Sequence, residues 1–320
     1  MEFRDGNTDE FDMQLDMSMA GVGAIMEGPI SNHKGSWLMS ARRSYLDLVV
    51  DAIDTGTAPR YGDIHGKLTY DINPRHRLSF LTLYGRSDIG FSKQEAIDSG
   101  QPSFGEFAAQ QNTVGMNWRW LWSNKGYSKA SLSHSFICSD RDFNNIITSE
   151  LQIHNDYLEG AVNFRNLNYF QISKTNRVEF GVDGAYNFAD YDYYYASDLN
   201  RLGQMQPALT VDNSFRSTRI GGYFSYMWYP VNHLMMNWGV RGDYNSINGK
   251  YHTSPRLSAT WQVSPLLSFN AAIGEFYQTL PTFIISQDAA NENLDDTRAL
   301  HYVVGCDYLL TADTKMSIKL

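Results

Sequence analysis

The chain has 320 residues, of which 42% are hydrophobic, and 26 basic and 35 acidic residues give it a formal net charge of -9. This acidic balance argues against a nucleic-acid partner, because nothing concentrates positive charge for contacts with phosphates. No run of about 18 apolar residues occurs, which excludes a transmembrane helix but not a membrane-spanning β-barrel. Aromatic residues reach 14%, an excess expected where rings gather at a membrane–water boundary.

The first residues, Met1 to Asn7, show no basic start followed by an apolar stretch, so they predict no signal peptide. An outer-membrane protein needs such a leader. Two interpretations follow: either the chain is not a membrane barrel, or it lacks its true beginning.

Polar and apolar residues alternate with a period of two along nearly the whole chain, which is typical of β-strands. Several of the resulting strands reach about 10–16 residues, whereas a globular strand has about 5–6 and a membrane-crossing strand needs about 9–11. The pattern predicts about fifteen strands, the last one a stub: 12–18, 22–30, 36–49, 61–72, 76–90, 111–122, 127–138, 149–170, 176–191, 215–229, 233–245, 254–263, 266–277, 298–310 and 314–320.

The connections between these strands alternate between tight turns and long loops. Tight turns are expected at 31–35, 73–75, 123–126, 173–176, 230–232, 264–265 and 311–314. Long loops are expected at 51–60, 91–110, 139–150, 192–214, 246–253 and 279–297. Outer-membrane barrels have short turns on one side of the membrane and long loops on the other. The sequence therefore predicts an all-β, transmembrane, antiparallel β-barrel.

Each predicted strand has one apolar face and one polar face, because successive side chains point to opposite sides. Arg119, Arg241 and Asp243 lie mid-strand opposite an apolar face, and we expect them to be charges in a water-filled lumen. Trp118, Trp120, Trp122, Trp238 and Trp261 share the apolar faces, and we expect them to lie at the lipid interface.

The odd number of strands and the terminal stub predict that the barrel is incomplete. Bacterial single-chain barrels have an even number of strands. A sheet with two free edges leaves backbone groups unpaired, which is unfavourable in lipid.

Four segments of the sequence resemble the TonB-dependent outer-membrane receptors of Bacteroidetes-like bacteria. The first, Phe3 to Phe11, resembles the exit from the plug domain into the barrel. The second, Met26-Glu-Gly-Pro-Ile30 with Lys34 to Tyr45, is similar to a recurrent turn and strand of that family. The third, Ser254 to Pro265 continuing to Gly274–Pro281, is similar to a recurrent hairpin, and the fourth, Leu300 to Leu310, to a late barrel strand.

The resemblance implies a plug-to-barrel exit segment at residues 1–11 and a partial receptor barrel at 12–320. Family barrels have about 22 strands, so about seven strands, as well as the plug, are missing from this chain. The implied function is TonB-coupled uptake of a scarce nutrient, such as a siderophore, cobalamin or glycan, in the bacterial outer membrane, with no cofactor. The implied partners are outer-membrane lipid, TonB and an extracellular ligand. Arg43 is expected to face the lumen, where it either pairs with acidic groups of a plug or is simply solvated.

No pattern in the sequence indicates an enzyme or a metal centre. The eight histidines lack ligand spacing, and the two cysteines, Cys138 and Cys306, are expected to act as small apolar residues. His134 stands between Ser133 and Ser135, but strand neighbours face opposite sides, so a catalytic pair is not expected.

The most unusual cluster is the run of tyrosines at 193–195, where a strand leaves the membrane for a long loop. Tyr193, Tyr194 and Tyr195 either stack on a ligand or form part of an interfacial aromatic girdle. Two alternatives to the receptor remain open: a porin-like channel without a plug, and a soluble β-rich module that binds carbohydrate or mediates adhesion.

Overall fold

A computed structural model describes residues 3–18, 20–53, 58–199, 202–311 and 313–320. Residues 1–2 of the expected exit segment, 54–57 and 200–201 of two expected loops, and 312 of an expected turn lie outside the described residues. Among the described residues, no helix is both long enough and apolar enough to cross a bilayer.

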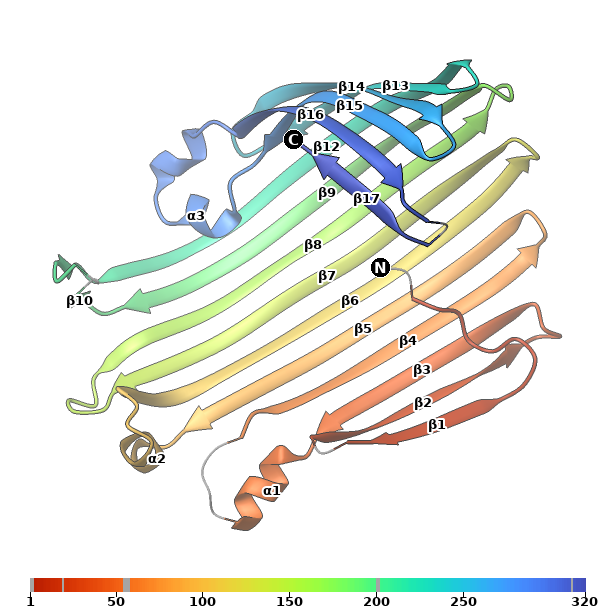
Figure 1. The fold of residues 1–320 in the computed structure, drawn as a ribbon. Helices are drawn as coiled ribbons and strands as arrows, with labels where there is room; N and C mark the ends of the chain where they lie inside the picture. The colour runs from red at the N-terminus through yellow and green to blue at the C-terminus, as the bar shows by residue number, and fades with distance from the viewer. Residues whose placement is uncertain (1–2, 19, 54–57, 200–201, 312) are drawn as a thin grey trace. The chain divides into compact units, whose positions relative to one another are not determined.

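Fifteen strands form one hydrogen-bonded sheet, in which neighbouring strands follow one another in chain order from β1 to β17 (Figure 1). They are β1 Asp12–Met17, β2 Gly21–Ile30, β3 Gly35–Ser44, β4 Arg60–Asn73, β5 His76–Phe91, β6 Ser103–Ser123, β7 Gly126–Asn145, β8 Leu151–Gln171, β9 Asn176–Tyr195, β12 Leu209–Val231, β13 Leu234–Asn245, β14 Lys250–Ser264, β15 Leu267–Gln278, β16 Thr297–Leu309 and β17 Lys315–Lys319. The pairings whose register is resolved in this sheet are all antiparallel. The strand order does not join β17 to β1, as expected for an incomplete all-β barrel.

The connections contain short elements that the alternation of the sequence does not reveal. These are the helices α1 Leu46–Ile53, α2 Lys93–Asp98 and α3 Thr282–Ser286, the 3-10 helix η1 Ala289–Asn293, and a small hairpin of β10 Asp198–Leu199 with β11 Met205–Gln206. The prediction of a strand over 36–49 is therefore wrong beyond Ser44. From Leu46 onward the apolar residues recur three and four positions apart, which is the spacing of a helix face.

Three of the expected long loops are largely strand and helix in the structure. β6 begins at Ser103, β7 continues to Asn145, and β9 continues to Tyr195. Backbone pairing does not need alternating polarity, so the strands continue past the residues that alternate. The sequence pattern thus shows where apolar alternation stops and not where the strands end.

The chain divides into two compact units, and several strands contribute residues to both. Unit 1 comprises residues 1–118, 132–162 and 186–216. In it, α1 and α2 lie at the end of the sheet away from the tight turns of β2–β3 and β4–β5 (Figure 1). The capping box of Ser92 and Glu95 begins α2, because each side chain accepts from the backbone N–H of the other residue.

Unit 2 comprises residues 119–131, 163–185 and 217–320. Its strands β12 to β17 pair in sequence, and α3 and η1 fill the connection from β15 to β16. The connection is tied back to the sheet, because Asp296 accepts from Asn248 at 3.2 Å and lies 2.8 Å from His252.

The register separates an apolar face from a polar face in both units. In unit 2, Trp238 is opposite Leu257, which is opposite Ile273, so apolar residues form continuous rows. These three side chains are 47%, 44% and 41% exposed in the isolated chain, which identifies a face that needs an apolar surrounding rather than a protein core.

Candidate functional site

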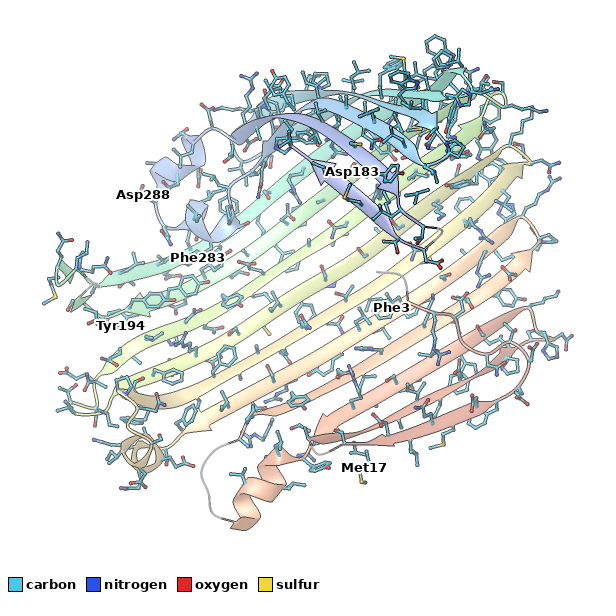
Figure 2. The ribbon with its side chains drawn as sticks, viewed as in Figure 1. Phe3, Met17, Asp183, Tyr194, Phe283 and Asp288 are labelled. Atoms are coloured by element: carbon cyan, nitrogen blue, oxygen red, sulfur yellow. The ribbon has the colours of Figure 1, made fainter. Side chains whose placement is uncertain are left out.

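The polar face of unit 2 carries a guanidinium held by two carboxylates. Arg241 of β13 donates through Nη1 and Nη2 to Oδ1 and Oδ2 of Asp183 on β9, at 2.8 and 2.9 Å. Its Nε donates to Asp243 at 2.9 Å. The planar fork of arginine suits this two-point contact with a carboxylate. Arg241 and Asp243, which the sequence analysis expects in a lumen, share one face of β13, and Asp183 (labelled in Figure 2) completes the group.

The polar face of unit 1 is covered in part by the N-terminal segment. Arg4 donates to both carboxylate oxygens of Glu27 on β2, at 2.6 and 2.7 Å, and the Asn7 backbone N–H donates to the same carboxylate at 2.8 Å. Asp5 accepts from Arg77 of β5 and lies 2.7 Å from Lys67 of β4. The segment is thus bound to three strands through opposite charges.

Close packing fixes the same segment against the sheet. The ring of Phe3 meets the ring of His65 edge to face at 6.1 Å, and Figure 2 shows Phe3 in front of the strands of unit 1. A Cβ on Gly6 would lie 2.2 Å from the carbonyl oxygen of Trp37, so this approach requires glycine. A cavity of about 320 Å³ lies beside the segment, lined by residues including Arg4, Arg42 and His65.

The prediction that Arg43 lies on the polar face is wrong. In β3, Arg42 is opposite Asp63 and bonds to it at 3.1 Å, whereas Arg43 is opposite Gly62. Arg43 therefore shares the other face with Met39 and Ala41. The error arises because the sequence offers two adjacent arginines and only the register shows which one faces inward.

The tyrosine run at 193–195 is split between the two faces of β9. Tyr191, Tyr193 and Tyr195 share one face, and Tyr194, labelled at the end of β9 in Figure 2, lies on the other. Tyr193 is only 4% exposed, and its ring lies 5.3 Å from Tyr191 and 6.3 Å from both Tyr157 and Tyr195. The cluster in the structure therefore consists of Tyr191, Tyr193 and Tyr195 of β9 together with Tyr157 of β8.

Burial and a neighbouring carboxylate keep this tyrosine cluster neutral. The cluster lies beyond the membrane-crossing part of β9, because Tyr191 is fifteen residues from Asn176 at the tight-turn end, whereas a crossing needs about 9–11. Burial, followed by the hydrogen bond that its hydroxyl donates to Glu159, raises the pKa of Tyr191. Burial also raises the pKa of Tyr193. Asn155 donates to the Tyr195 hydroxyl at 3.4 Å.

A histidine near the start of β8 lies between two carboxylates. His154 Nδ1 is 2.6 Å from Asp142, and its Nε2 is 3.7 Å from Asp192. The hydrogen bond with Asp142 raises the pKa of His154. Among the described residues, no group of three or more His, Cys, Asp or Glu side chains could hold a metal ion.

The tryptophans predicted at the lipid interface lie near the tight-turn ends of their strands. Trp118 donates to His76 at 3.2 Å, beside the β4–β5 turn, and Trp122 stacks on Phe170 at 5.3 Å. Trp261 lies 6.5 Å from Phe269 and Trp238 lies 5.6 Å from Phe224. Trp120 is 39% exposed. Arg119, beside it on β6, is exposed as well.

Long antiparallel strands with one apolar and one charged face define an outer-membrane β-barrel protein. The chain belongs to the TonB dependent receptor-like, beta-barrel family, whose model matches residues 44–314. Members of this family are outer-membrane transporters and not enzymes, and this membership excludes the soluble carbohydrate-binding module. A search of curated proteins finds no match.

Solved structures show the same fold at low sequence identity. The ferric enterobactin receptor PfeA of Pseudomonas aeruginosa is 12% identical with a TM-score of 0.69, over 97% of this chain and 51% of that one. The siderophore receptor PirA of Acinetobacter baumannii is 13% identical with a TM-score of 0.67, over 97% and 51%. The alcaligin receptor FauA of Bordetella pertussis is 14% identical with a TM-score of 0.65, over 96% and 49%. The chain spans about half the length of these structures.

Sequence reasoning missed the groups that bind the N-terminal segment. Glu27, Lys67 and Arg77 all lie on polar faces, so alternation alone could have placed them there. Their partners Arg4 and Asp5 precede the first strand, where no alternation of polarity predicts the position of a side chain.

Proposed function

We propose that this chain forms part of the wall of a TonB-dependent receptor that takes up a scarce nutrient across the outer membrane. Family membership supports the coupling to TonB. The observation that carries the proposal is the docked N-terminal segment: a charged face of the sheet binds protein rather than lipid, while the opposite face is apolar. This is the arrangement required of a lumen that contains a plug, and we assign residues 1–11 as the exit segment of such a plug and 12–320 as barrel.

The tyrosine cluster supports a ligand contact at the long-loop end of the polar face. Tyr195 is half-buried on the face that carries Tyr157 and Glu159; its hydroxyl accepts from Asn155 and can still donate, so the residue can contact a ligand with polar and aromatic groups. Tyr193 is packed beneath its neighbours and supports the position of Tyr195. Iron–siderophore complexes combine aromatic or carbonyl surfaces with polar groups, and the similar solved structures include siderophore receptors, so this class is the first to test.

Transport is tested in cells that produce the protein, by measuring uptake of radioactive iron supplied as ferric enterobactin and of radiolabelled cobalamin. We expect saturable uptake that disappears when TonB is deleted. Uptake that is equally fast without TonB would contradict the proposal and would favour the porin-like channel.

The ligand contact is tested by a matched pair of substitutions. Tyr195→Ala is expected to weaken binding of the transported compound about tenfold, the loss typical of a central aromatic contact. Tyr194→Ala removes an identical side chain from the opposite face of the same strand and is expected to leave binding within about twofold. Equal losses in both variants would contradict the assignment of Tyr195.

A further inference from the structure

Three arginines gather on the apolar face of unit 1, at the long-loop end of β3, β4 and β5. The register joins Arg43 to Gly62 and Gly62 to Arg86, so the two arginines flank a glycine in one row across three strands. Arg60 stands two residues from Gly62 on the same face of β4. This group of Arg43, Arg60 and Arg86 is the arginine row.

A groove lies next to the arginine row on the same face. Its cavity has a volume of about 650 Å³, and its apolar lining is Leu15, Val22, Ala24, Ala41, Ile64 and Tyr84. Gly62 has no side chain to fill the middle of the row, and the alanines below it keep the groove open. The site therefore combines a basic end with an apolar body.

The arginine row lies about one membrane thickness from the tight turns. Arg86 is ten residues beyond His76, the first residue of β5, and a strand needs about 9–11 residues to cross a membrane. Long loops of outer-membrane barrels are extracellular. The row thus lies at the level of the outer-leaflet headgroups, and the groove below it lies at the level of their acyl chains.

The carboxylates around the row leave positive charge unmatched. Asp88 lies 2.6 Å from Arg60 and 3.7 Å from Arg86, and Asp47 lies 3.3 Å from Arg43. Among the described residues, two carboxylates pair with these three guanidiniums, whose side chains are 61–65% exposed. Asp63 also lines the groove, but it is bound to Arg42. Each guanidinium has five N–H donors, so donors remain for an anion.

We propose that the arginine row and its groove bind a phosphorylated lipid of the outer leaflet, with the phosphate at the arginines and an acyl chain along Ala41 and Ile64. Arginine forks match the oxygens of a phosphate, and basic clusters at membrane level bind lipid headgroups. The corresponding rim of unit 2 presents instead the ring pair of Tyr244 and Tyr251 at 4.6 Å. The site depends on the membrane location alone and not on the transported nutrient.

The test measures binding of lipid A bisphosphate to the protein extracted from outer membranes in detergent, by native mass spectrometry. The double variant Arg43→Gln/Arg86→Gln is expected to bind at least about tenfold more weakly, because two charge-assisted hydrogen bonds are lost. The matched control Arg77→Gln removes the same charge from the opposite face of β5, outside the groove, and is expected to stay within about twofold of the unaltered protein. Heat-dependent electrophoretic mobility reports folding, and the single variant Arg86→Gln is measured if the double variant does not fold.

Two further ligands separate the possible sources of the phosphate. Phosphatidylglycerol is expected to bind more weakly than lipid A bisphosphate and to lose its binding in the same variants. Inorganic phosphate is expected not to compete at the concentrations that saturate lipid binding. Equal lipid binding by the double variant would overturn the proposal, and so would full competition by inorganic phosphate, since the groove would then contribute nothing.

Discussion

The polar faces of the two units hold their charges in different ways. In unit 2, Arg241 is bound by Asp183 and Asp243, which all belong to strands of the sheet. In unit 1, Glu27, Lys67 and Arg77 of the sheet are bound by Arg4 and Asp5, which belong to a segment outside it. The first arrangement is a permanent part of the wall, and the second can be released without breaking a strand. Loss of a charge is therefore expected to lower global stability in unit 2 and to increase the mobility of the N-terminal segment in unit 1.

The largest effect is expected from Arg241→Ala, which leaves two half-buried carboxylates facing each other. Removing one partner of a buried ion pair costs about 3–5 kcal/mol, and the partial exposure of this group lowers the expectation to about 2–3 kcal/mol. Urea-induced unfolding in detergent measures the loss. Arg241→Lys keeps the charge without the planar fork, and its loss of stability is expected to be smaller than that of the alanine variant. Equal losses would show that the charge alone contributes nothing without the two-point geometry.

A smaller effect is expected from Glu27→Gln, which removes the charge that holds Arg4. The loss of stability is expected to be about 1–2 kcal/mol for a charge-assisted hydrogen bond, and it is expected to be local. Hydrogen exchange of the Asn7 amide, which donates to Glu27, is expected to accelerate while strand amides stay protected. Asp9→Asn, in the same segment, is the control. General loss of protection across β2 to β5 would contradict a releasable segment.

In the tyrosine cluster of unit 1, Tyr191→Phe is expected to lower the free energy of unfolding by about 1 kcal/mol, because the hydrogen bond to Glu159 is lost. The raised pKa values of Tyr191 and Tyr193 also predict a pH dependence. Their contribution is fully present below the unfolded pKa of about 10 and decreases as pH rises above it. Spectrophotometric titration is expected to show that these two residues ionise at higher pH than the exposed tyrosines. Ionisation of all the tyrosines at the same pH would contradict the buried cluster.

The smallest effect is expected at His154, which is partly exposed. Its raised pKa means that the ion pair with Asp142 stabilises the fold fully below about pH 6.5 and that this contribution decreases as pH rises through the folded pKa. The contribution is expected to be below about 1 kcal/mol, as for other surface pairs. Asp142→Asn is expected to reduce this pH dependence, with Asp192 still near the ring, as measured by the unfolding midpoint between acidic and weakly alkaline pH. An unchanged slope would show that another group titrates.

Side-chain alternation was sufficient to predict which residues share a face wherever one face is apolar. The number of strands in the main sheet was predicted correctly for this reason, whereas the lumen position of Arg241 and Asp243 stays a prediction. The same signal failed for Arg42 and Arg43, since two adjacent charges satisfy either alternation. It also failed at the end of β9, where Tyr193 and Tyr195 still lie in the strand and Tyr193 is buried, because three consecutive tyrosines show no alternation of polarity.

The sequence by itself determined the all-β class, the strand count and the separation of apolar from charged faces, because a strand that borders lipid must repeat its polarity every two residues. Only the tertiary structure decided which charges meet, Arg241 with Asp183 and Arg4 with Glu27, and which lie in one row, Arg43 and Arg86 on either side of Gly62. These contacts join residues 23 to 58 positions apart or depend on register between strands. Pairing at that distance is fixed by the hydrogen-bonded ladder, and no local pattern in the chain encodes it.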